Sequence, residues 1–132
     1  PNYDQASIDQ VKLLLQRNRR AYLRQFYKTC FSSVDLRTYR WFKQTLQNEY
    51  LDMFLADELC RGLDWLSQAQ LCPNALKTIP WLTVIHGHDD RIAPVQGVID
   101  LAARLPQAKL ILLKQGGHVP FLSNEFKQNW HG

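Results

Sequence analysis

The sequence contains few cysteines and no long apolar run, and both absences narrow the class of protein. Its three cysteines are odd in number and form no Cys-x-x-Cys pair: Cys30, Cys60 and Cys72. Neither a disulfide framework nor a structural zinc site is therefore expected. No apolar stretch approaches the roughly 20 residues that span a bilayer. The start, PNYDQASIDQ, lacks the basic and apolar parts of a secretion signal. We therefore expect a cytoplasmic, globular chain.

The sequence also lacks the Gly-x-Ser-x-Gly motif, which places a nucleophilic serine on a sharp turn between a strand and a helix. None of the five serines has the flanking glycines: Ser7, Ser32, Ser33, Ser67 and Ser123. Any serine-based catalysis would therefore need a nucleophile from outside these 132 residues.

Acidic residues are almost absent from one segment of the first half. Nine basic residues lie between Lys12 and Lys43, and Asp35 alone opposes them, so this segment carries a net charge of +8. The sign reverses between Glu49 and Asp64, where five acidic residues face one arginine and the net charge is −4. A basic surplus confined to one segment indicates a surface that binds an acidic partner, although a charged stripe can also be a plain solvated face.

The first half of the chain has the apolar spacing of helices from about Ser7 to Ser67. Four apolar residues recur at helical spacing and form one stripe: Val11, Leu15, Tyr22 and Phe26. Four basic residues fall on the opposite side of the same helical wheel: Arg17, Arg20, Arg24 and Lys28. We take these four as the candidate site for a substrate or a partner.

Two more helices are expected before a connector. Ser32 and Asp35 are spaced as a capping box for a helix that continues to about Leu46. A further apolar run extends from Leu51 to Leu66 and predicts a third helix. The segment Leu71–Pro80 contains two prolines and is expected to be an irregular connector.

After Pro80 the pattern changes to strands that alternate with helices. Trp81–His86 and Lys109–Leu113 are short apolar runs typical of buried parallel strands. A helix is expected between them from Pro94 to about Leu105, and a last helix near Ser123, with Phe126 and Trp130 on it. Two parallel strands rarely stand alone, so we expect further strands from outside this sequence.

Each predicted strand leads into a turn that carries a chemically competent side chain. The first turn contains Asp90 and the second contains His118, which follows Gly116 and Gly117. Because neighbouring parallel strands end at the same edge of a sheet, an acid and a base in these turns would lie side by side. The two glycines would let the backbone next to His118 approach its neighbours closely.

These residues resemble the α/β-hydrolase family. The pattern Gly-x-x-Asp-x-x-x-Pro is present as Gly87, Asp90 and Pro94, and Gly-His-x-Pro-Phe follows the next strand as Gly117 to Phe121. The resemblance covers about residues 79–126. It implies the C-terminal part of an α/β-hydrolase sheet at 71–132, preceded by an all-helical cap at 1–70. The basic cap and the HVPF sequence are most similar to the branch that hydrolyses pimeloyl–acyl-carrier-protein methyl ester in biotin synthesis.

The resemblance implies a serine esterase without a cofactor. Asp90 would orient His118, and His118 would activate a serine located upstream of this sequence. The chain alone would then be inactive. Its partners would be an ester substrate, the missing N-terminal half of the hydrolase and an acidic acyl carrier protein at the basic cap. Neither a membrane nor a nucleic acid is expected as a partner.

Two alternatives compete for the same turn. Asp89 and Asp90 could each be an acid at the start of a helix, and the register of the motif selects Asp90 as the acid of the pair. In addition, His86, His88 and Asp90 spell His-x-His-x-Asp, which resembles the zinc loop of metallo-β-lactamases. Arg91 stands where that family has another histidine, and a cation there would oppose a metal ion.

Overall fold

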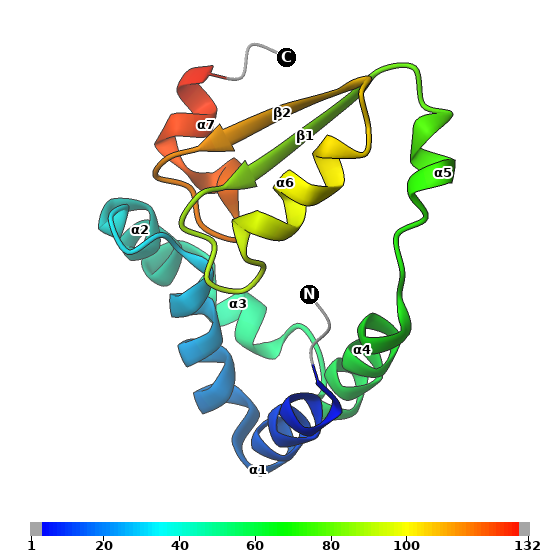
Figure 1. Cartoon of the computed structure of the whole chain (residues 1–132). Helices are drawn as coiled ribbons and strands as arrows, with labels where there is room; N and C mark the ends of the chain where they lie inside the picture. The colour runs from blue at the N-terminus through cyan, green and yellow to red at the C-terminus, as the bar shows by residue number, and fades with distance from the viewer. Residues whose placement is uncertain (1–3, 130–132) are drawn as a thin grey trace. The chain divides into compact units, whose positions relative to one another are not determined.

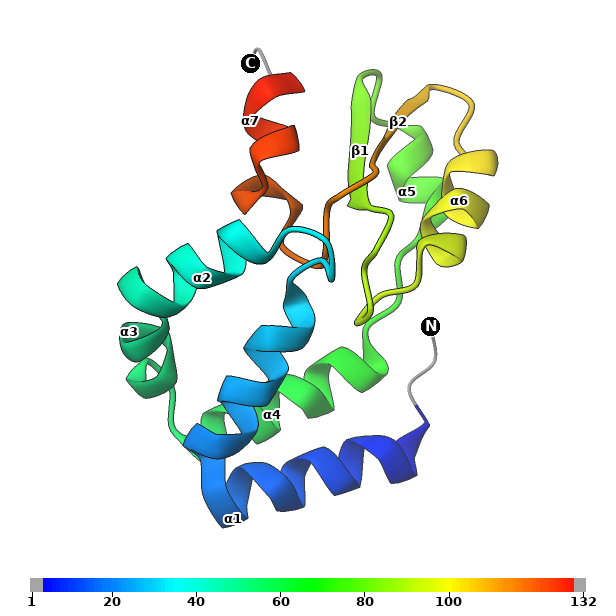
Figure 2. The same cartoon turned by 90° about the vertical axis from the view of Figure 1, so that its left-hand side faces the viewer.

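The computed structural model describes residues 4–129 of the chain, which form two compact units. One unit comprises Pro1–Lys28 and Arg40–Gln70, and the other comprises Thr29–Tyr39 and Leu71–Gly132. Figures 1 and 2 show the course of the chain through both units. The short segment 29–39, which includes the end of one helix and the start of the next, therefore belongs to the unit that contains the strands.

The first unit is built from helices that pack around a small apolar core. Its elements are α1 (Gln5–Cys30), α2 (Leu36–Thr45), α3 (Gln47–Asp52) and α4 (Ala56–Gln68), of which α1 and α2 continue into the other unit. The buried core residues are Leu15, Leu23, Leu51 and Cys60. Leu51 is fully buried and lies on α3, so even this short helix contributes to the core.

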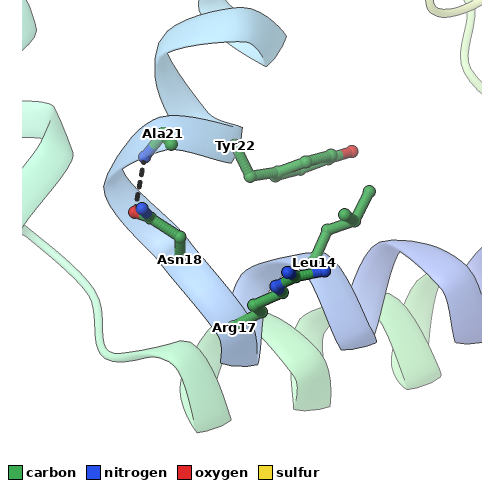
Figure 3. Close-up of a pocket in the computed structure, with 5 residues that line it drawn as sticks. All are labelled: Leu14, Arg17, Asn18, Ala21 and Tyr22. Atoms are coloured by element: carbon green, nitrogen blue, oxygen red, sulfur yellow. Dashed lines mark hydrogen bonds between the residues drawn. The ribbon is translucent and has the colours of Figure 1, made fainter.

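Helix α1 is interrupted at Asn18, whose backbone is not helical (φ −156°, ψ 81°). The side-chain Oδ1 of Asn18 accepts a hydrogen bond from the backbone N–H of Ala21 at 3.1 Å, which caps the second segment of the helix (Figure 3). The residues of the predicted stripe are therefore divided between two helical segments, although Val11, Leu15 and Tyr22 contribute to the same core. Arg17 lies before the break and the other three predicted basic residues lie after it, so the four share no straight helical face.

The remaining helix predictions need three corrections. The run from Leu51 to Leu66 is divided between α3 and α4, and Glu58 accepts a hydrogen bond from the N–H of Leu55 at the start of α4. The start of α2 is capped by Asp35 alone, which accepts hydrogen bonds from the backbone and hydroxyl of Thr38. The connector contains a short helix, α5 (Pro73–Lys77), which Pro73 initiates because its fixed φ suits the first turn.

The second unit contains the two strands that the sequence predicted, β1 (Leu82–Gly87) and β2 (Ala108–Leu113). They pair in parallel, with Leu82 opposite Ala108 and Gly87 opposite Leu113. Helix α6 (Val95–Ala103) connects them and packs against both strands (Figure 1). The parallel βαβ arrangement expected from the sequence is thus confirmed, and it aligns the carboxyl ends of the two strands.

The chain continues after β2 into a short 3-10 helix, η1 (Pro120–Leu122), and a last helix, α7 (Asn124–Asn129). Ser123 caps α7, because its Oγ accepts a hydrogen bond from the N–H of Phe126 at 3.1 Å. The expected start of this helix near Ser123 is confirmed. Trp130, which was expected on the same helix, lies outside the described residues.

Candidate active site

The candidate site forms where β1 and β2 end. Beyond Gly87 the chain turns through His88 and Asp89 to Asp90, and beyond Leu113 it turns through Gly116 and Gly117 to His118. Backbone hydrogen bonds join the two turns: the N–H of His88 donates to the carbonyl of Leu113 at 2.8 Å, and that of Asp89 to the carbonyl of Gly116 at 3.0 Å. The parallel register therefore brings the two turns into direct contact.

Three glycines allow this close contact. A Cβ atom on Gly87 would lie 2.2 Å from the carbonyl oxygen of Gly117, and a Cβ on Gly117 would lie 2.5 Å from that of Cys30. A Cβ on Gly116 would lie 3.0 Å from the Cβ of Leu113. All described glycines have negative φ, so close approach of the backbones, rather than an unusual backbone conformation, explains them. The expected close approach at Gly116 and Gly117 is confirmed.

Asp90 is held in a fixed orientation at the end of its turn. Its side chain is only 2% exposed. One carboxylate oxygen, Oδ1, accepts hydrogen bonds from the backbone N–H groups of Ile92 and Ala93, both at 2.8 Å. The second oxygen, Oδ2, lies 2.9 Å from Nδ1 of His118. Asp90 thus both caps the backbone that leads to α6 and contacts the histidine, so the structural and the chemical interpretations of this residue are compatible.

His118 faces Asp90 with one ring nitrogen and leaves the other available. Its backbone N–H donates to the carbonyl of Cys30 at 2.7 Å, which fixes the main chain of the residue. Because a carboxylate only accepts, Nδ1 carries the proton in the contact with Asp90. The side chain is 38% exposed, and Nε2 makes no hydrogen bond within residues 4–129. Nε2 is therefore free to accept a proton from a reacting group.

Asp89 has a different role from the one considered in the sequence. Its Oδ2 accepts hydrogen bonds from Ser32 and Ser33, which lie between α1 and α2. These contacts, above all those of the Ser33 hydroxyl and backbone N–H, lower the pKa of Asp89 below its usual value, and nearby Arg91 acts in the same direction. The interpretation of Asp89 as a helix-start acid was wrong, since its carboxylate binds a distant segment. This contact has no local signal in the sequence.

Glu125 is a further residue that the sequence analysis missed. Its two carboxylate oxygens accept hydrogen bonds from the backbone N–H groups of Lys114, at 3.0 Å, and Gln115, at 2.8 Å. One carboxylate therefore joins the two ends of the segment 116–124, which contains His118. The contact links the start of α7 to the end of β2 and supports the turn on which His118 lies.

The histidines of the His-x-His-x-Asp pattern do not form a metal-binding group. Nε2 of His86 lies 2.9 Å from the carbonyl oxygen of Ala93, and since a carbonyl only accepts, Nε2 carries a proton there. His88 is exposed. Within the described part of the chain, no three His, Cys, Asp or Glu side chains are grouped so as to hold a metal ion. Nε2 of His86 lies 3.4 Å from Oδ2 of Asp90, but no third ligand of the described range joins these two, as the zinc alternative would require.

The predicted basic residues differ in how they are engaged. Arg20 forms an ion pair with Asp52, and so does Arg19, which the sequence analysis did not single out. Arg20 is the main reason that the pKa of Asp52 lies below its usual value. Arg17, Arg24 and Lys28 are exposed. Arg17 and Arg24 form no hydrogen bond or ion pair with another residue of the range 4–129.

Arg17 also lines a small open pocket at the break in α1 (Figure 3). The pocket has a volume of about 150 Å³, and its other lining residues are Leu14, Asn18, Ala21 and Tyr22. Leu14 and Tyr22 supply apolar surface, and Arg17 adds a positive charge beside it (Figure 3). The pocket lies wholly within the helical unit.

Comparison with known proteins supports the fold. No family model and no curated protein matches the sequence. Among solved structures, the chain is similar to an esterase from Exiguobacterium antarcticum, with a TM-score of 0.73 and 18% sequence identity. The match covers 93% of this chain and 44% of the esterase, so the chain spans less than half the length of that protein.

At this level of identity the match shows a shared fold. The chain has part of an esterase fold, with a mostly helical first half followed by two parallel strands and their helices. This confirms the fold class predicted from the sequence. In the region that the structure describes, no helix combines the length and the apolar character that crossing a bilayer requires.

Proposed function

We propose that this chain is the C-terminal part of a serine carboxylic-ester hydrolase and supplies the acid, Asp90, and the base, His118. The observation that carries the proposal is the 2.9 Å contact between Oδ2 of Asp90 and Nδ1 of His118, with the acid buried and the base partly exposed. A buried carboxylate that orients a histidine, whose second nitrogen is free, is the arrangement that serine hydrolases need.

The reaction follows from these two side chains and a serine outside the chain. Asp90 holds the proton of His118 on Nδ1, which leaves the lone pair of Nε2 for the serine hydroxyl. As the serine Oγ attacks the ester carbonyl carbon, Nε2 takes its proton. The bond to the alcohol then breaks, and Nε2 returns that proton to the departing alkoxide. Water repeats the sequence on the acyl-enzyme and releases the acid and the free serine.

Partial burial of the sheet supports the idea that more of the enzyme packs against this chain. Only Gly87 in β1 and Leu113 in β2 are buried, whereas the other strand residues are partly or fully exposed. Parallel strands are ordinarily covered on both faces. The nucleophilic serine, the donors that stabilise the oxyanion and the remaining strands would all come from that part of the enzyme.

The proposed substrate is an acyl-carrier-protein-linked methyl ester, as in biotin synthesis. The exposed Arg17 and Arg24 would dock the acidic carrier protein, and His118 would act in the hydrolysis of the ester. The same surface supports the second candidate function, a basic helical module that binds an acidic protein without catalysis. Turnover separates these two candidates, because only the first depends on Asp90 and His118.

The test is mutation of the pair in the complete enzyme. We expect Asp90→Asn and His118→Ala each to lower kcat on the order of 10³- to 10⁴-fold, because the tautomer or the base itself is lost. Asp100→Asn is the matched control, since Asp100 contacts Gln96 on α6 and lies outside the pair. A fluorophosphonate should modify one serine outside these 132 residues. Near-normal turnover in both variants, or no such adduct, would contradict the proposal.

A further inference from the structure

The segment between α1 and α2 contacts both turns of the proposed acid–base pair. The carbonyl of Cys30 accepts the hydrogen bond from the backbone N–H of His118, at 2.7 Å. The carbonyl of Phe31 accepts one from the guanidinium of Arg91, one residue beyond Asp90, at 2.8 Å. The segment Cys30–Ser33 thus contacts both the acid turn and the base turn.

Asp89 makes the strongest of these connections. Three donors converge on its Oδ2: the Ser32 hydroxyl at 3.0 Å, the Ser33 backbone N–H at 2.6 Å and the Ser33 hydroxyl at 2.7 Å. The backbone N–H of Asp89 meanwhile donates to the carbonyl of Gly116 at 3.0 Å. Through its side chain and its main chain, this one residue contacts the segment and the base turn, and it directly precedes Asp90.

The segment Cys30–Ser33 is largely buried and packs closely against the base turn. Cys30, Phe31 and Ser32 are each no more than 5% exposed. Gly117 packs so closely on it that a Cβ would lie 2.6 Å from the backbone nitrogen of Ser32. A shift of the segment would therefore move the backbone of the base turn as well.

We propose that Asp89 is a positioning residue, which holds Cys30–Ser33 against both turns and so keeps Nδ1 of His118 on Asp90. The inference depends on the proposed function in one respect only, namely that Asp90 and His118 are catalytic. The geometric claim concerns this chain alone, because every contact that carries it lies within the second unit.

The test measures the tautomer of His118 by ¹⁵N NMR of the imidazole rings in the complete protein, with His118 assigned by its substitution with Gln. The wild-type ring should carry its proton on Nδ1, with slow exchange against water. In Asp89→Ala we expect the Nδ1–H form to lose its majority. The exchange of its proton should become faster by about tenfold or more, as expected when a hydrogen bond to a charged group is weakened.

Two further variants make the result specific. Ser33→Ala removes one of the three donors and keeps the backbone contact, so we expect a smaller change in the same direction. Asp100→Ala removes a carboxylate from α6 and should leave the ring of His118 unchanged.

A folded Asp89→Ala protein in which His118 keeps the wild-type tautomer and proton exchange rate would overturn the inference. If Asp89→Ala does not fold, the tautomer and exchange rate of His118 in Ser33→Ala decide instead. Because the readout needs no turnover, it stands apart from the proposed function. An active Asp90→Asn enzyme would refute catalysis by the pair and leave the positioning result intact.

Discussion

At the scale of single residues, Gly117 lies where a side chain cannot fit. A Cβ atom there would meet backbone atoms of Cys30, Phe31 and Ser32, which cannot rotate away as a side chain could. We expect Gly117→Ala to destabilise the protein by about 1–3 kcal/mol, the usual cost of overpacking a buried site. Chemical denaturation measures this change.

Gly97 provides the matched control for this substitution. A Cβ at Gly97 would meet no atom within 4 Å, and the residue lies in α6. Gly97→Ala should therefore stabilise the protein by about 0.5–1 kcal/mol, because alanine favours the helix. Equal effects of the two substitutions would show that close packing at Gly117 contributes nothing.

Asp89 should make stability depend on pH in the acidic range. Its pKa is lower in the folded protein than its ordinary value of 3.8, because Ser33, Ser32 and Arg91 favour the charged form. The unfolded chain therefore binds the proton more readily. The stabilisation is fully present above that ordinary value and is lost as the pH falls through the lowered one.

Urea denaturation across this range tests the sign. Asp89→Asn should be less stable than the wild type at neutral pH and should lose less further stability on acidification. Asp100→Asn, a matched change of carboxylate to amide, should retain the acid dependence that Asp89 causes. A wild-type acid dependence in Asp89→Asn would contradict the assignment.

At the scale of elements, the break in α1 depends on one side chain. Asn18 caps the second segment through its contact with the N–H of Ala21, while Leu15 and Leu23 fix the two segments in the core. Asn18→Ala should therefore cost about 1 kcal/mol in a denaturation experiment, although alanine favours helices. Asn18→Ser keeps a capping oxygen and should stay close to the wild type. A more stable Asn18→Ala protein would mean that the break is not needed.

The strands and the pair at their ends could be predicted because their signals are local. Two apolar runs, Pro94 and the turn residues specify a βαβ unit, and parallel pairing then aligns Asp90 with His118. The choice of Asp90 over Asp89 came from the register of the motif. In the structure Asp90 contacts His118, whereas the Oδ2 of Asp89 is bound by the two serines.

The helix boundaries were harder to predict, because weak caps compete with strong apolar periodicity. Asn18 lies inside a run that favours helix on both sides, so its capping signal was overlooked. The contact of Ser32 with Asp89 joins residues 57 positions apart. No periodicity or spacing in a single sequence encodes such a pair, since only the packed fold brings its members together.

At the scale of the whole molecule, the exposed arginines of the helical unit are the feature to test against a partner. Arg17→Glu with Arg24→Glu should weaken binding of the complete enzyme to an acidic carrier protein and reduce the salt dependence of that binding. Arg20 is left unchanged because Asp52 already pairs with it. Titration calorimetry at two salt concentrations measures both effects.

The pair Arg104→Glu with Lys77→Glu is the charge-matched control, since both residues are exposed in the other unit, Arg104 at the end of α6 and Lys77 in the last turn of α5. It should change binding far less than the Arg17→Glu, Arg24→Glu variant. Equal losses in the two double variants would show that only net charge matters. If the Arg17→Glu, Arg24→Glu variant loses no binding, these arginines are only a solvated surface and bind no acidic partner.

The burial of Cys30 gives the protein a chemical reporter of its own. Burial raises the pKa of this thiol to about 12. Cys60 is also buried, whereas Cys72 is exposed. An alkylating reagent should therefore modify Cys72 at once and reach Cys30 only when the segment on which His118 rests has opened. The rate of modification at Cys30, followed separately from that at the buried Cys60, would measure how often the segment that contacts the proposed acid–base pair opens in the otherwise native protein.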